Sequence, residues 1–117
     1  MADRRKILIV DDEVDLCLLL RDYFTRLKFE VKVAYTIDEG KMLLQSFVPD
    51  ILFLDNNLSD GTGWSDAPAF AEQFPKLYIV LVSAFHPHLP QMPDSARFQV
   101  IEKPIRFADL ERQFASY

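Results

Sequence analysis

Short, mostly apolar runs separated by segments of helical periodicity constrain the fold of this chain more than any other feature. The runs are KILIV (6–10), ILFL (51–54), LYIVLV (77–82) and FQVI (98–101). Such runs are too short for core helices and are typical of strands buried on both faces of a sheet. A further segment, EVKVAY (30–35), largely alternates polar and apolar residues and predicts an edge strand.

Helical periodicity fills most of the intervals between these strands. Leu16, Leu20 and Phe24 recur at helical spacing in the first interval. Thr36 and Glu39 form a T-x-x-E capping box that opens a second helix. The predicted helices span 14–27, 36–47, 66–74 and 107–114.

The interval between the last two strands departs from this pattern. The stretch SAFHPHLPQMPD, residues 83–94, carries a proline at every third position, namely Pro87, Pro90 and Pro93. Each proline removes a backbone donor and clashes with the preceding turn of a helix. We therefore expect a loop where the alternation calls for a helix.

Strands that alternate with helices predict a parallel sheet covered on both faces. We expect an α/β, flavodoxin-like doubly wound fold with five strands in the order 2-1-3-4-5 and with the fourth helix missing or rudimentary. The 117 residues are expected to form a single domain, 1–117.

Composition excludes several classes of function. The net charge of −5 argues against nucleic acid as a direct partner, because phosphate binding needs clustered Lys and Arg. The single Cys17 excludes an internal disulfide and a multi-cysteine metal site. The apolar runs are far shorter than a bilayer span, and the start MADRRK leads straight into a strand. We therefore expect a cytoplasmic protein with no membrane partner.

Polar residues follow the strands at the edge where such sheets carry their sites. Asp11 and Asp12 follow the first strand, Asp55 the third, Ser83 the fourth and Lys103 the fifth. The first and third strands are neighbours in the predicted order, about 4.8 Å apart. Three carboxylates are therefore expected to converge on one small volume.

This set of side chains indicates phosphoryl chemistry with a divalent cation. Carboxylates so close repel one another unless a cation lies among them. Mg²⁺ suits the hard oxygen ligands best, with Mn²⁺ as an alternative. A lysine and a hydroxyl at the same edge match the oxygens of a transferred phosphoryl group. Asp55, at the tip of a buried strand, is the predicted carboxylate nucleophile, which would form an acyl-phosphate.

The chain resembles the receiver domain of two-component response regulators, the CheY-like superfamily, over nearly its whole length. The motifs that carry the resemblance are ILIVDDE (7–13), ILFLDNNLSDGTG (51–63), VLVSA (80–84) and IEKP (101–104). The resemblance implies that Asp11 and Asp12 hold Mg²⁺, directly or through water, together with Asp55 and the backbone carbonyl of Asn57. Asp55 would accept phosphate from a histidine kinase or a histidine phosphotransfer protein.

The resemblance also assigns the residues around the phosphate. Ser83 would bond a phosphoryl oxygen, Lys103 would pair with the phosphate, and the small Ala84 would leave room for it. Pro104 would lie next to the phosphate site, and the Lys103–Pro104 bond is expected to be cis. Phe85 occupies a position that influences how quickly the acyl-phosphate hydrolyses, and its bulk could shield the group from water.

The chain departs from the family's pattern at the surface through which receivers usually signal. Val100 stands where a switch Tyr or Phe is expected, with Phe98 two residues before it, and Ser59 replaces a usual proline. The proline loop takes the place of the fourth helix. We therefore expect an atypical output face that contacts an unknown downstream protein or output domain, in a stand-alone receiver or the front of a longer protein.

Two other functions are weighed against this one. A pseudo-receiver would use the fold as a phosphorylation-independent interaction module, which the lost helix and switch aromatic favour and the intact acidic site opposes. A Mg²⁺-dependent phosphatase or nuclease would need a D-x-D motif or further acids, whereas D-N-N stands at Asp55. The preferred function is a signalling module whose chemistry is limited to its own phosphorylation and dephosphorylation.

Overall fold

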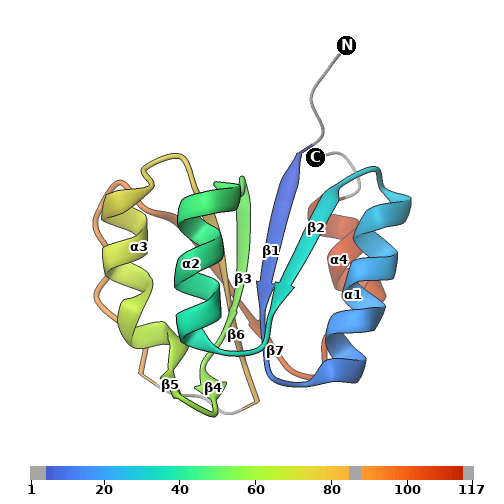
Figure 1. Cartoon of the computed structure of the whole chain (residues 1–117), viewed down its shortest axis with the longest axis horizontal. Helices are drawn as coiled ribbons and strands as arrows, with labels where there is room; N and C mark the ends of the chain where they lie inside the picture. Colours follow the sequence, from blue (N-terminus) through green and yellow to red (C-terminus); the bar gives the residue numbers. More distant parts are fainter. Residues whose placement is uncertain (1–4, 85–87, 115–117) are drawn as a thin grey trace.

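The computed structural model describes residues 5–84 and 88–114. Its strands are β1 (Lys6–Val10), β2 (Glu30–Ala34), β3 (Ile51–Asp55), β4 (Asn57–Leu58), β5 (Gly61–Thr62), β6 (Tyr78–Ser83) and β7 (Arg97–Glu102). Its helices are α1 (Val14–Arg26), α2 (Ile37–Phe47), α3 (Ala67–Gln73) and α4 (Phe107–Phe114), with a short 3₁₀ helix, η1 (Gly63–Asp66), before α3. Figure 1 shows these elements in chain order, and each strand and helix predicted from the sequence is present.

The five longer strands form one parallel sheet in the order β2-β1-β3-β6-β7. This is the predicted order 2-1-3-4-5, because β6 and β7 are the fourth and fifth strands of this sheet. Val10 of β1 pairs with Leu54 of β3, and Ser83 of β6 pairs with Glu102 of β7. The polar residues beyond these positions therefore emerge at the same edge of the sheet.

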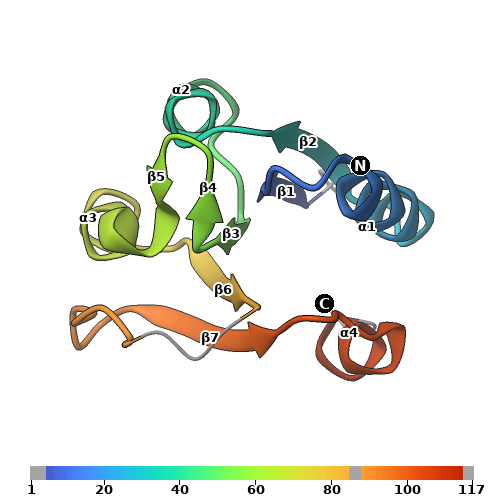
Figure 2. The same cartoon turned by 90° about the horizontal axis from the view of Figure 1, so that it is seen from below.

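Helices cover both faces of the sheet, as Figures 1 and 2 show. Alternate residues of each strand point to opposite faces. Ile7 and Ile9 belong to the cluster under α1 and α4, whereas Leu8 and Val10 belong to the cluster under α2 and α3. Burial of each such side chain stabilises the fold by about 1.5–3 kcal/mol. The doubly wound prediction is confirmed.

The start of α2 follows the predicted capping box. The hydroxyl of Thr36 accepts a hydrogen bond from the backbone N–H of Glu39 at 3.1 Å, and the Glu39 carboxylate accepts one from the N–H of Tyr35 at 2.8 Å. The longest helix, α1, has 13 residues, whereas a membrane span needs about 20. Across the residues that the structure describes, no helix could cross a membrane.

Residues 57–62, predicted as loop, contain a small antiparallel hairpin. Asn57 of β4 pairs with Thr62 of β5, and Gly61 has a φ of 150°, in a region that L side chains rarely adopt. Strands of two residues are too short to carry any periodicity, so hydropathy patterns do not detect them. The hairpin places the chain after Asp55 against the start of α2, where Asp60 accepts hydrogen bonds from two backbone N–H groups.

The fourth crossover lacks a helix over its described residues, as predicted. Residues 88–96 form no regular element, and only a turn near residue 94 interrupts them. Met92 and Ala96 pack with Phe98 against the core cluster under α2 and α3, which partly covers this face of the sheet. Val100 on β7 stays 46% exposed. The proline loop therefore replaces the helix incompletely.

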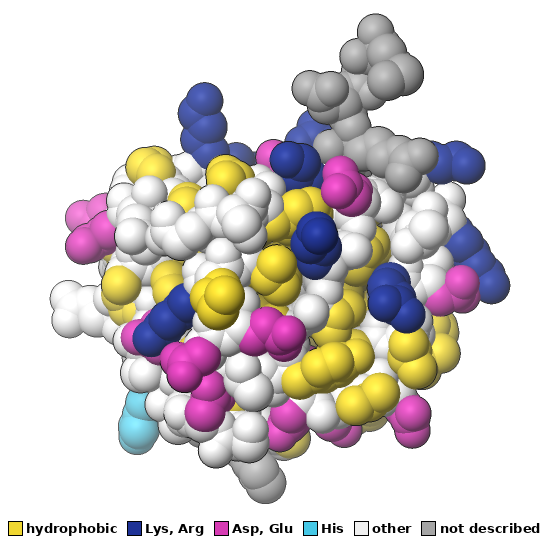
Figure 3. Space-filling model, viewed as in Figure 1, with side chains coloured by type: hydrophobic (Ala, Val, Ile, Leu, Met, Phe, Trp, Pro, Cys, Tyr) yellow, Lys and Arg dark blue, Asp and Glu magenta, His cyan; other side chains and the backbone are white. Residues whose placement is uncertain are grey.

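Apolar side chains also reach the surface along α1. Val14, Leu18 and Leu19 are exposed, and Figure 3 shows apolar side chains at the surface over the lower part of this helix. Val14 is the first residue of α1 and follows the acidic segment 11–13 directly. The exposed apolar face therefore begins next to the polar edge of the sheet.

Candidate functional site

Asp11 and Asp55 lie at the ends of two neighbouring strands in the centre of the sheet. Since Val10 pairs with Leu54, the residues one step further, Asp11 and Asp55, come side by side. Both are almost fully buried, with exposed fractions of 4% and 2%. Two buried carboxylates this close repel each other and require a positive partner.

Asp12 adds a third carboxylate to this pair. One oxygen from each of Asp11, Asp12 and Asp55 lies within 4.8 Å of the other two. Mg²⁺ binds oxygen at about 2.0–2.1 Å, so oxygens on opposite sides of one ion are about 4 Å apart. The Asp12 side chain is exposed and has room to turn toward such an ion. The donor set fits Mg²⁺ or Mn²⁺.

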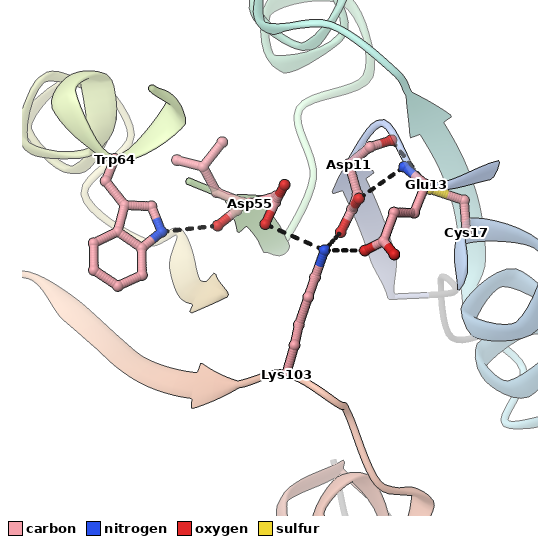
Figure 4. A network of polar contacts seen from close by, with 7 residues as sticks. Asp11, Glu13, Cys17, Asp55, Trp64 and Lys103 are labelled. Atoms are coloured by element: carbon pink, nitrogen blue, oxygen red, sulfur yellow. Dashed lines mark hydrogen bonds and ion pairs between the residues drawn. The ribbon is translucent and has the colours of Figure 1, made fainter. Parts of the chain in front are cut away.

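Lys103, on the segment that follows β7, supplies the positive charge of this site, and Figure 4 shows its side chain reaching toward Asp11 and Asp55. Its Nζ lies 3.1 Å from Oδ2 of Asp11 and 3.4 Å from Oδ1 of Asp55. The same ammonium also donates to the carboxylate of Glu13. Three carboxylates thus share the Lys103 ammonium. Its contact with Glu13 holds the loop after β7 against the start of α1.

The backbone aligns Lys103 with Ser83. The Lys103 N–H donates to the carbonyl of Ser83 at 2.8 Å, which extends the pairing of β6 with β7 by one residue. Ser83 itself is buried, with 2% of its surface exposed. The predicted serine therefore lies at the same end of the sheet as the acidic group.

Two residues of η1 pack behind Asp55. A Cβ atom on Gly63 would lie only 2.3 Å from the backbone oxygen of Asp55, so no other residue fits here without a shift of the backbone. The indole Nε1 of Trp64 donates to the backbone carbonyl of Leu54 at 3.2 Å. These contacts hold the end of β3 from behind and leave the Asp55 carboxylate facing Lys103.

Burial and the contacts between Lys103 and the carboxylates together set the pKa values of the site. Burial raises the pKa of Asp55 to about 6, repulsion from Asp11 adds to this effect, and Lys103 opposes it. Burial likewise raises the pKa of Asp11. Burial lowers the pKa of Lys103, but the hydrogen bonds to Glu13 and Asp11 outweigh it, so the net shift is upward and the ammonium stays charged. The Cys17 thiol donates to the Asp11 carbonyl at 3.3 Å, and burial raises its pKa to about 12, so it stays protonated.

The site opens to solvent through a cleft of about 640 Å³. Its lining residues are Asp12, Glu13, Leu16, Asp55, Asn57, Ala84, Lys103, Pro104 and Ile105. Asn57, expected at the metal, and Ala84 and Pro104, expected near the phosphate, therefore border the same space as Asp55. Phe85, also expected there, lies outside the described residues.

Comparison with known proteins assigns the chain to a family. The family model for the response regulator receiver domain matches residues 7–115. The chain belongs to this family. The bond between Lys103 and Pro104 of this receiver domain is cis, as the resemblance implied.

Two curated relatives of this receiver domain are regulatory proteins. The photosynthetic apparatus regulatory protein RegA of Rhodobacter capsulatus is 31% identical over 84 residues, which cover 72% of this chain and 45% of that protein. The response regulator protein PilR of Pseudomonas aeruginosa is 30% identical over 82 residues, which cover 70% of this chain and 18% of that protein. The chain thus spans less than half the length of either relative.

Solved structures agree with the fold of this receiver domain. A CheY-like receiver domain protein from Methanospirillum hungatei JF-1 superposes with a TM-score of 0.83 at 20% identity, covering 97% of this chain and 93% of that one. A two-component response regulator from Clostridium difficile gives a TM-score of 0.81 at 23% identity, covering 97% and 94%. At these identities the likeness concerns the fold alone.

Three residues of the site are not predicted by the sequence. The position of Glu13 directly after the acidic pair indicates that it lies near the site. Its contact with Lys103 is not indicated, because the two residues are 90 positions apart in the sequence. Gly63 ends the D-N-N-L-S-D-G-T-G motif, where a glycine also suits a simple turn. For Trp64, the sequence gives no sign that its indole reaches the backbone beside Asp55.

Proposed function

We propose that this receiver domain accepts a phosphoryl group on Asp55 in a reaction that depends on Mg²⁺, with Mn²⁺ as an alternative. The observation that carries the proposal is the convergence of Asp11, Asp12 and Asp55 on one volume opposite Lys103. Three carboxylates fit a divalent cation, and a half-buried lysine beside them fits the additional negative charge of a phosphoryl group.

Each residue has a defined part in this reaction. Asp11 and Asp12 would hold the metal with Asp55 and the carbonyl of Asn57, and the bound metal would neutralise charge that develops on the phosphoryl oxygens. A carboxylate oxygen of Asp55 forms the new bond to phosphorus while the bond from phosphorus to the donor's imidazole nitrogen breaks. The imidazole leaves with the electron pair of that bond.

Lys103 and Ser83 would receive the transferred group. The Lys103 ammonium, already 3.4 Å from Asp55, needs only a small movement to pair with a phosphoryl oxygen. The Ser83 hydroxyl would donate to another oxygen, and Ala84, at the mouth of the cleft, leaves room for the group. This chemistry makes the domain a signalling module that modifies only itself.

The donor that we propose is a histidine kinase or a histidine phosphotransfer protein. The phosphohistidine must approach Asp55 through the cleft, whose border includes Leu16 and Ile105. Leu19 of α1, three residues after Leu16 and thus on the same side of the helix, is also exposed and extends this apolar border. A donor helix packed there would bring its imidazole to the cleft, and a separate downstream protein or output domain would read the phosphorylated state.

A pseudo-receiver is the alternative function, favoured by one observation. Val100 takes the place of the switch aromatic and lies exposed beside a crossover without a helix in its described residues. A chain that never transmitted phosphorylation could lose these features without harm. The retained Lys103, Asp55 and acidic pair argue for the phosphoacceptor.

Phosphorylation by a small donor tests the proposal. Incubation with Mg²⁺ and acetyl phosphate should add a single phosphate, detected by mass spectrometry of the intact chain. The Asp55→Asn variant should stay unmodified, and chelation of the metal should abolish the reaction. An unmodified wild-type chain, or a modified Asp55→Asn chain, would instead support the pseudo-receiver.

A further inference from the structure

Glu13 occupies a fixed position at the mouth of the cleft. Its backbone N–H donates to Oδ1 of Asp11 at 2.9 Å, and its backbone is extended, with φ −82° and ψ 100°, immediately before α1. The side chain is 56% exposed and reaches across the cleft to Lys103. Asp11 therefore fixes Glu13 with one carboxylate oxygen and pairs with Lys103 through the other.

The three carboxylates around Lys103 are not equivalent. The Lys103 ammonium donates a hydrogen bond to Glu13 and lies 3.1 Å from Asp11, whereas Oδ1 of Asp55, at 3.4 Å, is a buried oxygen without a hydrogen-bond partner among the described residues. Asp11 and Asp55 are buried, whereas Glu13 is exposed to solvent. The ammonium is thus drawn toward the solvent side of the cleft, away from the residue proposed to accept phosphate.

A phosphoryl group on Asp55 would need the same ammonium. Phosphate carries more negative charge than a carboxylate and offers more acceptor oxygens, so Lys103 must turn from Glu13 toward it. The contact with Glu13 stabilises the unphosphorylated state and is lost or weakened in the phosphorylated one. A ligand that must displace such a contact binds more weakly by the strength of that contact.

We propose that Glu13 is a positioning residue that holds the Lys103 ammonium at the mouth of the cleft and competes for it with a phosphoryl group on Asp55. This inference rests on the proposed phosphoacceptor function. Glu13 thereby lowers the affinity of the site for phosphate, and it does so through Lys103. Exposed ion pairs shift equilibria by about 1.4- to 5-fold, so the effect should be of this size.

Binding of beryllofluoride, a phosphoryl mimic, tests the inference without turnover. Its affinity is measured by titration calorimetry at saturating Mg²⁺ for the wild type, for Glu13→Gln and for Asp15→Asn. Asp15 is an exposed acid in the first turn of the same helix, so its substitution changes the net charge equally. We expect Glu13→Gln to bind beryllofluoride about 1.4- to 5-fold more tightly, and Asp15→Asn to differ from wild type by less than about 1.4-fold.

A double-mutant cycle shows whether Glu13 acts through Lys103. In a Lys103→Ala background, Glu13→Gln should no longer strengthen binding. A gain that persists there would assign the effect to direct repulsion between Glu13 and the anion and would overturn the inference. Equal or weaker binding by Glu13→Gln in the otherwise native chain would overturn it as well, while the phosphoacceptor function would stand. No binding by the wild type would overturn both.

Discussion

Trp64 donates a hydrogen bond from its indole nitrogen to the backbone carbonyl of Leu54, the residue directly before Asp55, over 3.2 Å. The ring is buried and is the only tryptophan of the chain. Trp64, the strongest fluorophore of the chain, is therefore linked to Asp55 through the backbone of Leu54 alone, and its emission should respond to a change of charge at Asp55. The structure provides its own reporter of the site.

We expect Mg²⁺ with beryllofluoride to change the fluorescence of Trp64 in a saturable manner. The Asp55→Asn variant, which lacks the carboxylate that beryllofluoride binds, should lose the response to the anion. A wild-type emission spectrum that stays constant while calorimetry shows binding would contradict the proposed link between Trp64 and the site.

The buried Asp55 should lower the stability of the metal-free protein. Its folded pKa is raised from 3.8 to about 6 by burial and by Asp11, so the folded state holds a proton that the unfolded state releases between these values. Stability should therefore fall as the pH rises through this window and stay reduced above it. At pH 7.5 we expect Asp55→Asn to be more stable than wild type by about 1–3 kcal/mol, since one pKa unit corresponds to about 1.36 kcal/mol.

Denaturant unfolding at pH 7.5 and near pH 4 measures this effect. The difference between Asp55→Asn and wild type should shrink at the lower pH, where Asp55 is protonated in the folded state. Saturating Mg²⁺ should also reduce it, because the ion stabilises only the chain that binds it. Equal stability of the two metal-free chains at pH 7.5 would contradict the prediction.

Gly63→Ala should disrupt the end of β3. The new Cβ would lie 2.3 Å from the Asp55 backbone oxygen and 2.9 Å from Cδ1 of Leu54, so the backbone must shift. Overpacking costs about 1–3 kcal/mol, and a clash with backbone belongs at the upper end of that range. Thr62→Ala, an exposed neighbour, should change stability by less than about 1 kcal/mol in the same urea titration. Comparable losses in the two variants would show that Gly63 is not needed for close packing.

The sequence predicts the sheet and the acidic group well because both follow from local patterns. KILIV and ILFL are buried on both faces, and in a parallel sheet the residues after neighbouring central strands must meet at one edge. Strand ends are predicted less well: β7 extends from Arg97 to Glu102, beyond the apolar run, because pairing with β6 sets its length. Hydrogen bonds to the neighbouring strand carry no hydropathy signal.

Other parts of the site depend on contacts that no local pattern reports. The contact of Glu13 with Lys103 depends on the rotamers of two long side chains brought together by the finished sheet. The contact of Asp60 with the start of α2 depends on a hairpin of two-residue strands. In both cases the residue types are visible in the sequence, whereas the partner is fixed only by tertiary structure.

Asp60 should stabilise the start of α2 from outside the helix. Its carboxylate accepts hydrogen bonds from the N–H groups of Ile37 at 2.8 Å and Asp38 at 3.2 Å, and the bond from Ile37 contributes most to lowering its pKa. A lowered folded pKa gives stabilisation that is present above the unfolded value of 3.8 and is lost as the pH falls through the folded value.

We therefore expect Asp60→Ala to lower the melting temperature at neutral pH, and Asp60→Asn to lower it less, because an amide oxygen still caps the helix. The difference between wild type and Asp60→Ala should diminish in strong acid. A melting temperature that Asp60→Ala leaves unchanged at pH 7 would show that the hairpin does not support α2.

The loop between β6 and β7, which takes the place of the helix expected there, should respond to the state of Asp55. Ser83, proposed to bind the phosphoryl group, lies at the end of β6, and the loop that follows is attached to the core through Met92 and Ala96. A movement of Ser83 toward a bound phosphoryl group would pass directly into this segment, because no helix in residues 88–96 holds it in place.

We expect amide hydrogen exchange in residues 88–96 to change when Mg²⁺ and beryllofluoride bind, while amides of the edge strand β2 exchange as before. Asp55→Asn should show no change in either segment. Identical protection of residues 88–96 with and without the mimic would place the readout elsewhere, and the exposed face of α1 would then be the next surface to test.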